Sequence, residues 1–263
     1  MIFLRSLVFN VFYYLITAIM AAATLPVFIF SPGRGGGWVI RLWASIEICL
    51  LRTIVGTRLV VRGIENLPSG GALVAAKHQS MFETFALFTL LDRPSFVMKR
   101  ELTRIPLWGW YAIRAGAIAV GRDEGTSALR QLAVAVGKAI ARGRKVVIFP
   151  EGTRRPPGAE ADYKGGIAHL YRRTGAHVVP VALNSGLFWP RRRFRRYPGT
   201  LVIAFLPPIA PGLKSREFMT RLEVEIEAAS TELLTEAAEA MPPPALLPEA
   251  LERLGQRDSH GRI

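Results

Sequence analysis

Cysteine is almost absent from this sequence, and internal repeats and metal-binding patterns are not evident. The 263 residues contain one cysteine, Cys49, which excludes an internal disulfide. No cluster of potential ligands indicates a metal site. A chain of this length can bury one core and carry an appendage, but it is short for two enzyme domains. We therefore expect one functional domain and no metal ion.

Charge is also absent from residues 6–31, which are rich in leucine, phenylalanine, tyrosine, isoleucine, valine and alanine. As a helix this segment is long enough to cross the hydrocarbon of a bilayer. A secretory signal peptide is the alternative, because Arg5 precedes the run and Ala21-Ala22-Ala23 resembles a cleavage site. The apolar run continues to Phe30, which is longer than a signal-peptide core requires, so an uncleaved anchor fits better.

A second apolar stretch, residues 38–55, carries three charged residues and predicts an amphipathic helix at the interface or folded back on the first. We therefore interpret residues 1–57 as a membrane-anchoring two-helix segment. One arginine precedes the first helix and several follow it, which predicts a cytoplasmic location for the rest of the chain. A half-inserted hairpin at the inner membrane gives the same orientation. The following arginines are Arg34, Arg41, Arg52, Arg58 and Arg62.

The net charge of +14 predicts a partner of opposite charge, either anionic lipid or nucleic acid. Five arginines between residues 191 and 196, interleaved with aromatic residues, suit both partners. Because the same chain carries an apolar anchor, membrane lipid is the simpler interpretation, and no nucleic-acid partner is expected. The alternative for any single arginine is a solvated loop without a partner.

Beyond residue 57, short β-branched runs alternate with helical patterns, which is typical of an α/β domain. We expect one domain over residues 58–240, with a mostly parallel or mixed central sheet flanked by helices. The near-continuous apolar strands should lie at its centre, although Pro180 suits an edge or a strand start. The expected strands are residues 58–62, 72–76, 95–98, 117–120, 145–149, 178–183 and 201–205.

Helical patterns occupy residues 81–91, 126–141 and 164–174. A further helix is predicted over residues 215–240, where apolar side chains recur at helical spacing. Residues 241–263 begin near three prolines and end with polar residues, so we predict a C-terminal tail that is partly disordered.

The first segment with potential chemistry runs from Lys77 to Glu83, directly after a predicted strand. Glu83 follows His78 by five positions, so its carboxylate can hold one ring nitrogen while the other removes a proton from an alcohol. The alternative is structural, because Ser80 and Glu83 also form the pattern of a helix capping box. On this segment alone the two interpretations stand equal.

Three further segments include or follow predicted strands, where α/β sheets commonly bind ligands. Gly121 and Arg122 end one strand and combine close backbone approach with a phosphate-binding side chain. Residues 149–154 place backbone N–H groups, a hydroxyl and a guanidinium together, which suits a phosphomonoester or an oxyanion. Ordinary turns are the alternative for both. The fourth segment, residues 178–184, carries no chemistry by itself.

In this order the four segments resemble the motifs of the glycerolipid acyltransferase family, which includes bacterial 1-acylglycerol-3-phosphate acyltransferase. The family shows His-x4-Asp, a Gly…Arg strand, Phe-Pro-Glu-Gly-Thr-Arg and a Val-Pro-Val strand. The resemblance covers the chain from about residue 58 to about residue 205, and residues 149–154 match in full. Glu83 departs from the pattern, because it replaces aspartate with a side chain one methylene longer.

The resemblance implies an O-acyltransferase of phospholipid biosynthesis that converts lysophosphatidic acid to phosphatidic acid. His78 would be the base on the acceptor hydroxyl, with Glu83 orienting the imidazole. Acyl-CoA or acyl carrier protein would be the co-substrate, with no cofactor and no covalent acyl-enzyme. The implied acceptor-binding residues are Gly121, Arg122, Glu151, Gly152, Thr153 and Arg154. Further candidates, from charge and placement, are Lys77, Lys99 and Arg100.

Three other functions fit parts of the sequence. The same chemistry could serve another lysolipid, such as a lyso-ornithine lipid. A lipid hydrolase could use the same histidine and carboxylate with water as acceptor. A non-catalytic, membrane-tethered protein could bind anionic ligands through its basic surface, but that function leaves His78 and residues 149–154 without a role.

Overall fold

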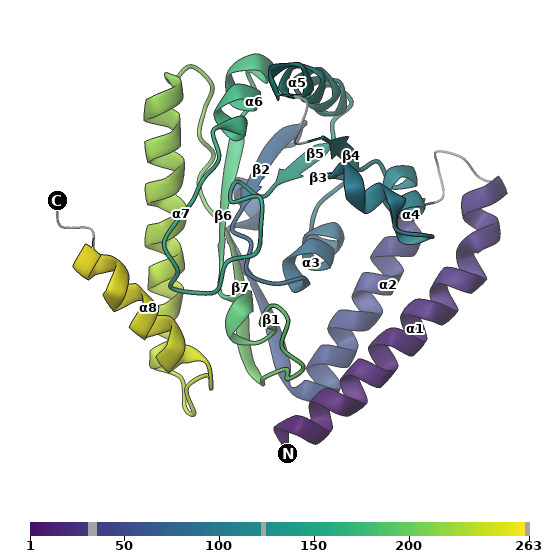
Figure 1. Ribbon diagram of the computed structural model, residues 1–263, viewed down its shortest axis with the longest axis vertical. Helices are drawn as coiled ribbons and strands as arrows, with labels where there is room; N and C mark the ends of the chain where they lie inside the picture. Colours follow the sequence, from purple (N-terminus) through teal and green to yellow (C-terminus); the bar gives the residue numbers. More distant parts are fainter. Residues whose placement is uncertain (31–35, 122–124, 261–263) are drawn as a thin grey trace.

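The computed structural model describes residues 1–30, 36–121 and 125–260. Its centre is a seven-stranded sheet with helices on both faces, so the predicted α/β fold is confirmed (Figure 1). The observed strands lie within two residues of the predicted ones at each end. They are β1 (Thr57–Arg62), β2 (Ala72–Ala76), β3 (Pro94–Lys99), β4 (Ile118–Val120), β5 (Lys145–Ile148), β6 (Val178–Leu183) and β7 (Gly199–Phe205).

The strand order is β1-β7-β6-β2-β5-β3-β4. Strands β6, β2, β5, β3 and β4 are mutually parallel, whereas β7 is antiparallel to β6 and parallel to β1. The sheet is therefore mostly parallel with two reversed strands at one edge. Because five strands point the same way, the segments that follow them meet at one edge of the sheet, where ligand sites of such folds lie.

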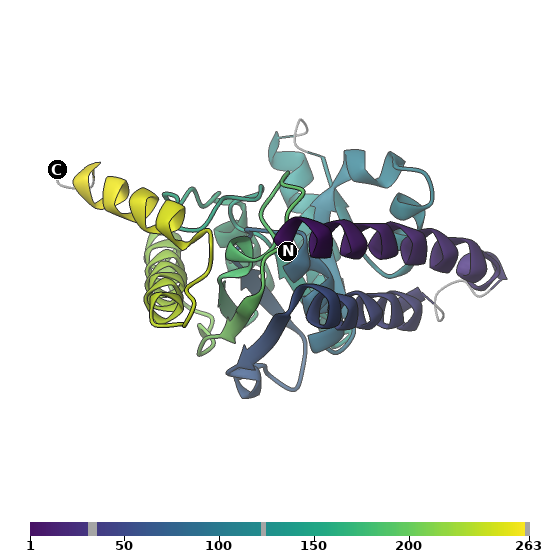
Figure 2. The ribbon, with the colours of Figure 1, turned by 90° about the horizontal axis from the view of Figure 1, so that it is seen from below.

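The helices cover the sheet from two sides and extend beyond it at both termini (Figures 1 and 2). They are α1 (Ile2–Phe30), α2 (Gly36–Leu50), α3 (Phe82–Leu90), α4 (Trp108–Arg114), α5 (Gly125–Ala141), α6 (Gly166–Thr174), α7 (Ser215–Ala238) and α8 (Leu247–His260). Short helical turns complete the chain, namely η1 (Leu51–Val55), η2 (Ile64–Asn66), η3 (Arg100–Arg104) and η4 (Ser185–Leu187).

Two apolar layers form the core, one on each face of the sheet. Within β2, Val74 and Ala76 belong to the layer shared with α1, α2 and α3, whereas Leu73 and Ala75 belong to the layer shared with α5, α6 and α7. Every residue of β2 and β6 is buried. Burial on both faces explains why these strands are apolar runs rather than alternating ones.

Helix α1 exposes apolar side chains and also packs other side chains against the domain. Residues 2–26 are long and apolar enough to cross a membrane. Phe9 and Tyr13 are nevertheless buried against Trp189, with ring centroids 5.3 and 5.6 Å from the indole. Near its other end, the Ala21 carbonyl accepts a hydrogen bond from the Tyr111 hydroxyl (2.5 Å). The helix therefore lies along the domain rather than leaving it.

The C-terminal segment differs from the expected disordered tail, because residues 247–260 form α8. Leu246, Leu247 and Ala250 are buried against the domain, and Arg253 donates a hydrogen bond to the Pro157 carbonyl (3.0 Å). The prolines at 242–244 separate two helices instead of beginning a disordered tail.

Pro180 also differs from its expected place, since β6 lies inside the sheet between β7 and β2. The Pro180 carbonyl accepts a hydrogen bond from the Leu206 amide (2.9 Å), just after β7 ends. Val178 and Ile209 then exchange two backbone hydrogen bonds (3.0 and 2.8 Å). The register changes by one residue between the Val181–Phe205 pair and the Val178–Ile209 bridge, and Pro180 lies at this irregular step, where a strand tolerates proline.

Candidate active site

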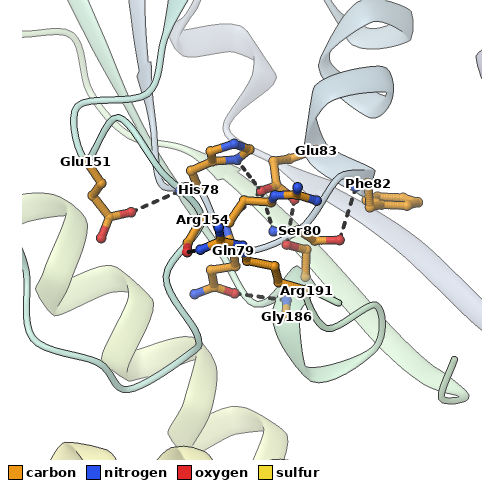
Figure 3. A network of polar contacts seen from close by, with 10 residues as sticks. His78, Gln79, Ser80, Phe82, Glu83, Glu151, Arg154, Gly186 and Arg191 are labelled. Atoms are coloured by element: carbon orange, nitrogen blue, oxygen red, sulfur yellow. Dashed lines mark hydrogen bonds and ion pairs between the residues drawn. The ribbon is translucent and has the colours of Figure 1, made fainter. Parts of the chain in front are cut away.

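His78 lies in the turn between β2 and α3, and Glu83 lies in the first turn of α3 (Figure 3). The His78 Nδ1 is 2.9 Å from the Glu83 Oε1. Glu83 is fully buried, whereas 17% of the His78 side chain is exposed. The carboxylate engages Nδ1, so Nε2 is the ring nitrogen available to a substrate proton.

The Glu83 carboxylate accepts hydrogen bonds from two elements of the fold. Besides the imidazole, Oε1 accepts from the amides of Gln79 and Ser80, both at 2.7 Å. The other oxygen, Oε2, accepts from the Ser185 hydroxyl at 2.7 Å. Glu83 therefore binds the backbone at the helix start, as a capping box predicts, and the same carboxylate contacts the His78 ring.

The loop after β5 holds His78 from the other side. The Phe149 ring stacks on the imidazole with centroids 3.9 Å apart and planes 16° apart. The His78 amide donates to the Glu151 Oε2 (3.2 Å), and the Arg155 amide donates to the His78 carbonyl (2.8 Å). The ring plane and the main chain of His78 are thus both held in one orientation.

A buried ionic cluster lies beneath this turn. The Lys77 ammonium is 3.1 Å from the Glu151 Oε1 and is also paired with Glu227 on α7. The Tyr163 hydroxyl donates to the Glu227 Oε1 (3.0 Å). Burial raises the pKa of Glu151, and the charge of Lys77 opposes that rise. The cluster fastens β2, the loop after β5 and α7 together.

Arginines gather beside the His78–Glu83 pair (Figure 3). Burial and the charge of Arg191 lower the pKa of Arg154, and the negative charge of Glu83 opposes them. Arg191 donates a hydrogen bond from Nη1 to the Arg154 carbonyl (2.9 Å). Two guanidinium groups next to His78 on one edge of the sheet form an environment that favours an anionic ligand.

Comparisons with known proteins agree with this geometry. Residues 58–184 match the model of a protein family described as Acyltransferase. The chain is 35% identical over 199 residues to a 1-acyl-sn-glycerol-3-phosphate acyltransferase of Pseudomonas aeruginosa, a match that covers 76% of this chain and 77% of that protein. This chain belongs to the acyltransferase family.

Further relatives of the acyltransferase come from plants and bacteria. The chloroplastic 1-acyl-sn-glycerol-3-phosphate acyltransferase LPAT1 of Arabidopsis thaliana is 30% identical over 161 residues, which are 60% of this chain and 44% of that protein. The crystal structure of a 1-acyl-sn-glycerophosphate acyltransferase, PlsC, from Thermotoga maritima superposes with a TM-score of 0.73 at 23% identity. It covers 89% of this chain and 98% of that one, and the likeness concerns the fold.

Most of the other predicted site residues of the acyltransferase follow parallel strands at the same edge of the sheet. Gly152, Thr153 and Arg154 follow β5, and Gly152 has a positive φ of 63° that favours glycine. Lys99 ends β3 and is half-buried, and Arg100 beside it is exposed. Gly121 follows β4, whereas Arg122 lies outside the described residues.

Lys77 and Glu151 differ from their predicted roles in acceptor binding. Lys77 is 3% exposed and Glu151 is 1% exposed, and they pair with each other. A phosphate cannot reach an ammonium that is buried between two carboxylates. Both residues therefore support the site from beneath, where Glu151 holds the His78 amide.

Ser185 and Gly186 were not predicted as site residues from the sequence, and Arg191 was not placed beside Arg154. Ser185 on η4 supports Glu83, and the Gln79 side chain accepts a hydrogen bond from the Gly186 amide (3.0 Å). Arg191 reaches Arg154 from the following loop. Ser185 and Gly186 directly follow β6, so the rule that places sites after parallel strands could have found them. The sequence marked Arg191 only as part of a basic run, and no signal placed it beside Arg154, because its partner there is a distant carbonyl.

We expect Ser185→Ala to lower the rate of acyl transfer about tenfold, because a hydrogen bond to a charged group contributes roughly 1.5 kcal/mol. Steady-state kinetics measure this loss of rate. Ser185→Thr should restore the hydroxyl, and Ser45→Ala on α2 is the control. A wild-type rate for Ser185→Ala would exclude a positioning role.

We expect Lys77→Met to lower the free energy of unfolding by about 3 kcal/mol, because it leaves buried carboxylates unpaired. Without Lys77 the folded-state pKa of Glu151 rises further above its ordinary 4.5, so the folded protein binds a proton that the unfolded chain releases. The loss should therefore be larger at about pH 8 than at about pH 5. Thermal unfolding at both pH values measures this.

The control for Lys77→Met is Lys138→Met, which removes an exposed ammonium from α5. This variant should unfold like the wild type at both pH values. Equal destabilisation by the two substitutions, or a loss for Lys77→Met that does not depend on pH, would contradict the role of the cluster.

Proposed function

We propose that this acyltransferase moves an acyl group from an acyl thioester to the free sn-2 hydroxyl of 1-acylglycerol-3-phosphate and produces phosphatidic acid. The observation that carries this proposal is the His78–Glu83 pair, in which the carboxylate engages Nδ1 and Nε2 remains for a hydroxyl proton. The names of the relatives supply the acceptor, since they are described as 1-acyl-sn-glycerol-3-phosphate acyltransferases.

In the proposed reaction, His78 Nε2 removes the proton of the acceptor hydroxyl as its oxygen attacks the thioester carbon. Glu83 stabilises the imidazolium that forms. The tetrahedral intermediate then collapses, the carbon–sulfur bond breaks, and the imidazolium returns the proton to the leaving thiolate. The proton is therefore conserved within one turnover, and the protein forms no covalent bond to the acyl group.

Arg154 is the described residue best placed to bind the acceptor phosphate. Its guanidinium is half-buried and lies close enough to Glu83 for their charges to interact. A phosphomonoester presents oxygens that match the fork of an arginine. We include Gly121, Arg122, Gly152 and Thr153 in the proposed acceptor site, with Lys99 and Arg100 as further contacts.

The proposed co-substrate is acyl-CoA or acyl carrier protein, and no cofactor takes part. Both carriers are anionic, and the net charge of +14 favours their approach. The chemistry described above needs only a base, an activated thioester and a bound acceptor.

We propose that the enzyme sits in the inner membrane with its catalytic domain on the cytoplasmic face. Helix α1 contacts the domain from Phe9 to Ala21, which supports insertion into one leaflet rather than a full crossing. Large apolar side chains cover its outer face. With the enzyme at the membrane, the acyl chain of the acceptor need not enter water, a transfer that costs about 0.8 kcal/mol per methylene. The exposed side chains include Leu4, Leu7, Val8, Val11, Phe12, Leu15 and Ile19.

We expect His78→Ala to lower the rate of phosphatidic acid formation roughly a thousandfold, the contribution of a well-placed general base. The assay uses detergent-solubilised protein, a labelled acyl thioester and 1-acylglycerol-3-phosphate. His169→Ala on α6 is the control and should keep the wild-type rate. Product formation by His78→Ala at the wild-type rate would remove the proposed mechanism. Acyl release by the wild type without any lysolipid would indicate a hydrolase instead.

We expect Arg154→Gln to raise the KM for 1-acylglycerol-3-phosphate about tenfold or more, because a charged hydrogen-bond donor to the phosphate is lost. The rate of acyl transfer to a lyso-ornithine lipid should be the same for this variant as for the wild type. Arg155→Gln is the matched control, since its guanidinium bonds outward to the Glu160 carbonyl. An equal rise in KM for both acceptors would show that Arg154 does not recognise the phosphate.

A further inference from the structure

The loop of residues 191–196, here called the arginine loop, lies beside the N-terminal turns of α1 (Figures 1 and 2). Two polar side chains of α1 hold it there. The Ser6 hydroxyl accepts a hydrogen bond from the Arg196 amide (2.9 Å) and lies 3.3 Å from its carbonyl oxygen. The Asn10 side chain donates to the Phe194 carbonyl (3.1 Å). The loop and the anchor helix therefore form one surface.

The arginine loop is also fixed internally. The Arg196 side chain is buried and stacks on Trp189, 4.6 Å from the ring centroid. Its Nη1 donates to the carbonyls of Arg193 (2.6 Å), Phe194 (3.0 Å) and Arg195 (3.2 Å). One guanidinium thus organises three consecutive carbonyls. The shape of the loop exists before any partner arrives, which lowers the entropic cost of binding.

Phe194 projects from this loop next to the apolar surface of α1. Its ring lies 5.4 Å from that of Phe3, and the two side chains are 45% and 58% exposed. An exposed pair of aromatic rings continuous with an apolar helix face marks an interaction surface. Aromatic side chains of this kind are common where a protein meets the boundary between hydrocarbon and headgroups.

The arginines around Phe194 are exposed but not equivalent. Arg193 forms an ion pair with Glu249 on α8 (2.7 Å). Arg191 holds the Arg154 carbonyl. No ion pair with a carboxylate is found for Arg192 or Arg195 within the described part of the chain. Arg192 also adopts a positive φ of 59°, which an arginine occupies only at a cost of roughly 1 kcal/mol.

We propose that the arginine loop is a second membrane contact, in which Phe194 enters the headgroup region beside Phe3 while Arg192 and Arg195 bind the phosphates of anionic lipids. This inference rests on the proposed membrane seat of α1. Continuity with the anchor places the loop at the bilayer surface. The two guanidinium groups, for which the described residues offer no carboxylate partner, match the charge of anionic headgroups. A solvated loop would need neither the exposed ring nor the fixed shape.

The contact also places the lipid surface next to the acceptor site. Arg191 belongs to the same loop and holds the main chain of Arg154, so the loop joins the bilayer surface to the proposed phosphate site. A lysolipid that leaves the membrane beside Phe194 would pass the arginine loop before it reaches Arg154. The loop therefore serves to orient the site toward its membrane-borne acceptor.

Single-cysteine probes test the position of the loop. In a Cys49→Ser background, Leu15→Cys on α1, Phe194→Cys and Val224→Cys on α7 are each labelled with an environment-sensitive fluorophore. These three positions are all exposed in the protein. The full-length proteins are reconstituted into phosphatidylcholine vesicles with or without phosphatidylglycerol. Nitroxide lipids quench probes in the bilayer, and iodide quenches probes in water.

We expect lipid quenching at residues 15 and 194 and iodide quenching at residue 224. If residue 194 behaves like residue 224 while residue 15 is quenched by lipid, the arginine loop is not a membrane contact. If residue 15 is also open to iodide, the proposed seat of α1 is wrong, and the inference that rests on it fails with it. The two failures are therefore distinguishable.

The role of the arginines is tested with charge variants of the probe protein. Lipid quenching at residue 194 should increase at least severalfold when anionic lipid is added, and Arg192→Gln with Arg195→Gln should abolish this increase. Arg172→Gln with Arg173→Gln removes the same charge from α6 and should leave it intact. Equal quenching in neutral and anionic vesicles, or equal effects of both double variants, would overturn the assignment to anionic headgroups.

Discussion

The carboxylate of Glu83 is the point on which the geometry of the candidate site depends. It is fully buried and accepts four hydrogen bonds, from the imidazole, two amides at the start of α3 and the Ser185 hydroxyl. A buried carboxylate is costly unless its oxygens are satisfied, and each donor here also fixes one part of the site. The turn η4 supplies the partner of the second carboxylate oxygen through Ser185.

The buried ionic cluster beneath the turn that holds His78 also fixes more than one part of the site. Lys77 and Glu151 lie close to His78, yet both are buried, and Lys77 also pairs with Glu227 on α7. The consequence is that a helix remote in sequence helps to hold the loop that stacks on the imidazole. Two charged residues of the motif at 149–154 therefore differ in position. Arg154 faces the site, whereas Glu151 supports it from beneath.

The sequence predicted the features that depend on local patterns. Apolar strands such as residues 72–76 and 178–183 were found with their observed bounds, because burial on both faces leaves an unmistakable run. The pairing of His78 with Glu83 followed from their spacing across one turn. Features that depend on distant partners were missed, including the burial of Lys77 against α7 and the support of Glu83 by Ser185. Helix α8 was predicted as part of a partly disordered tail. Its few apolar residues are buried only by packing against the domain, which the local sequence does not reveal.

The burial of Phe9 and Tyr13 against Trp189 has a consequence for handling the protein. Deleting the first helix to obtain a water-soluble enzyme would strip the cover from Trp189 and from the aromatic residues packed around it. It would also remove Ser6 and Asn10, which hold the arginine loop. A soluble form should instead keep α1 and replace its outward-facing apolar side chains, such as Leu7, with polar ones. The membrane anchor of this enzyme is thus also part of its hydrophobic core.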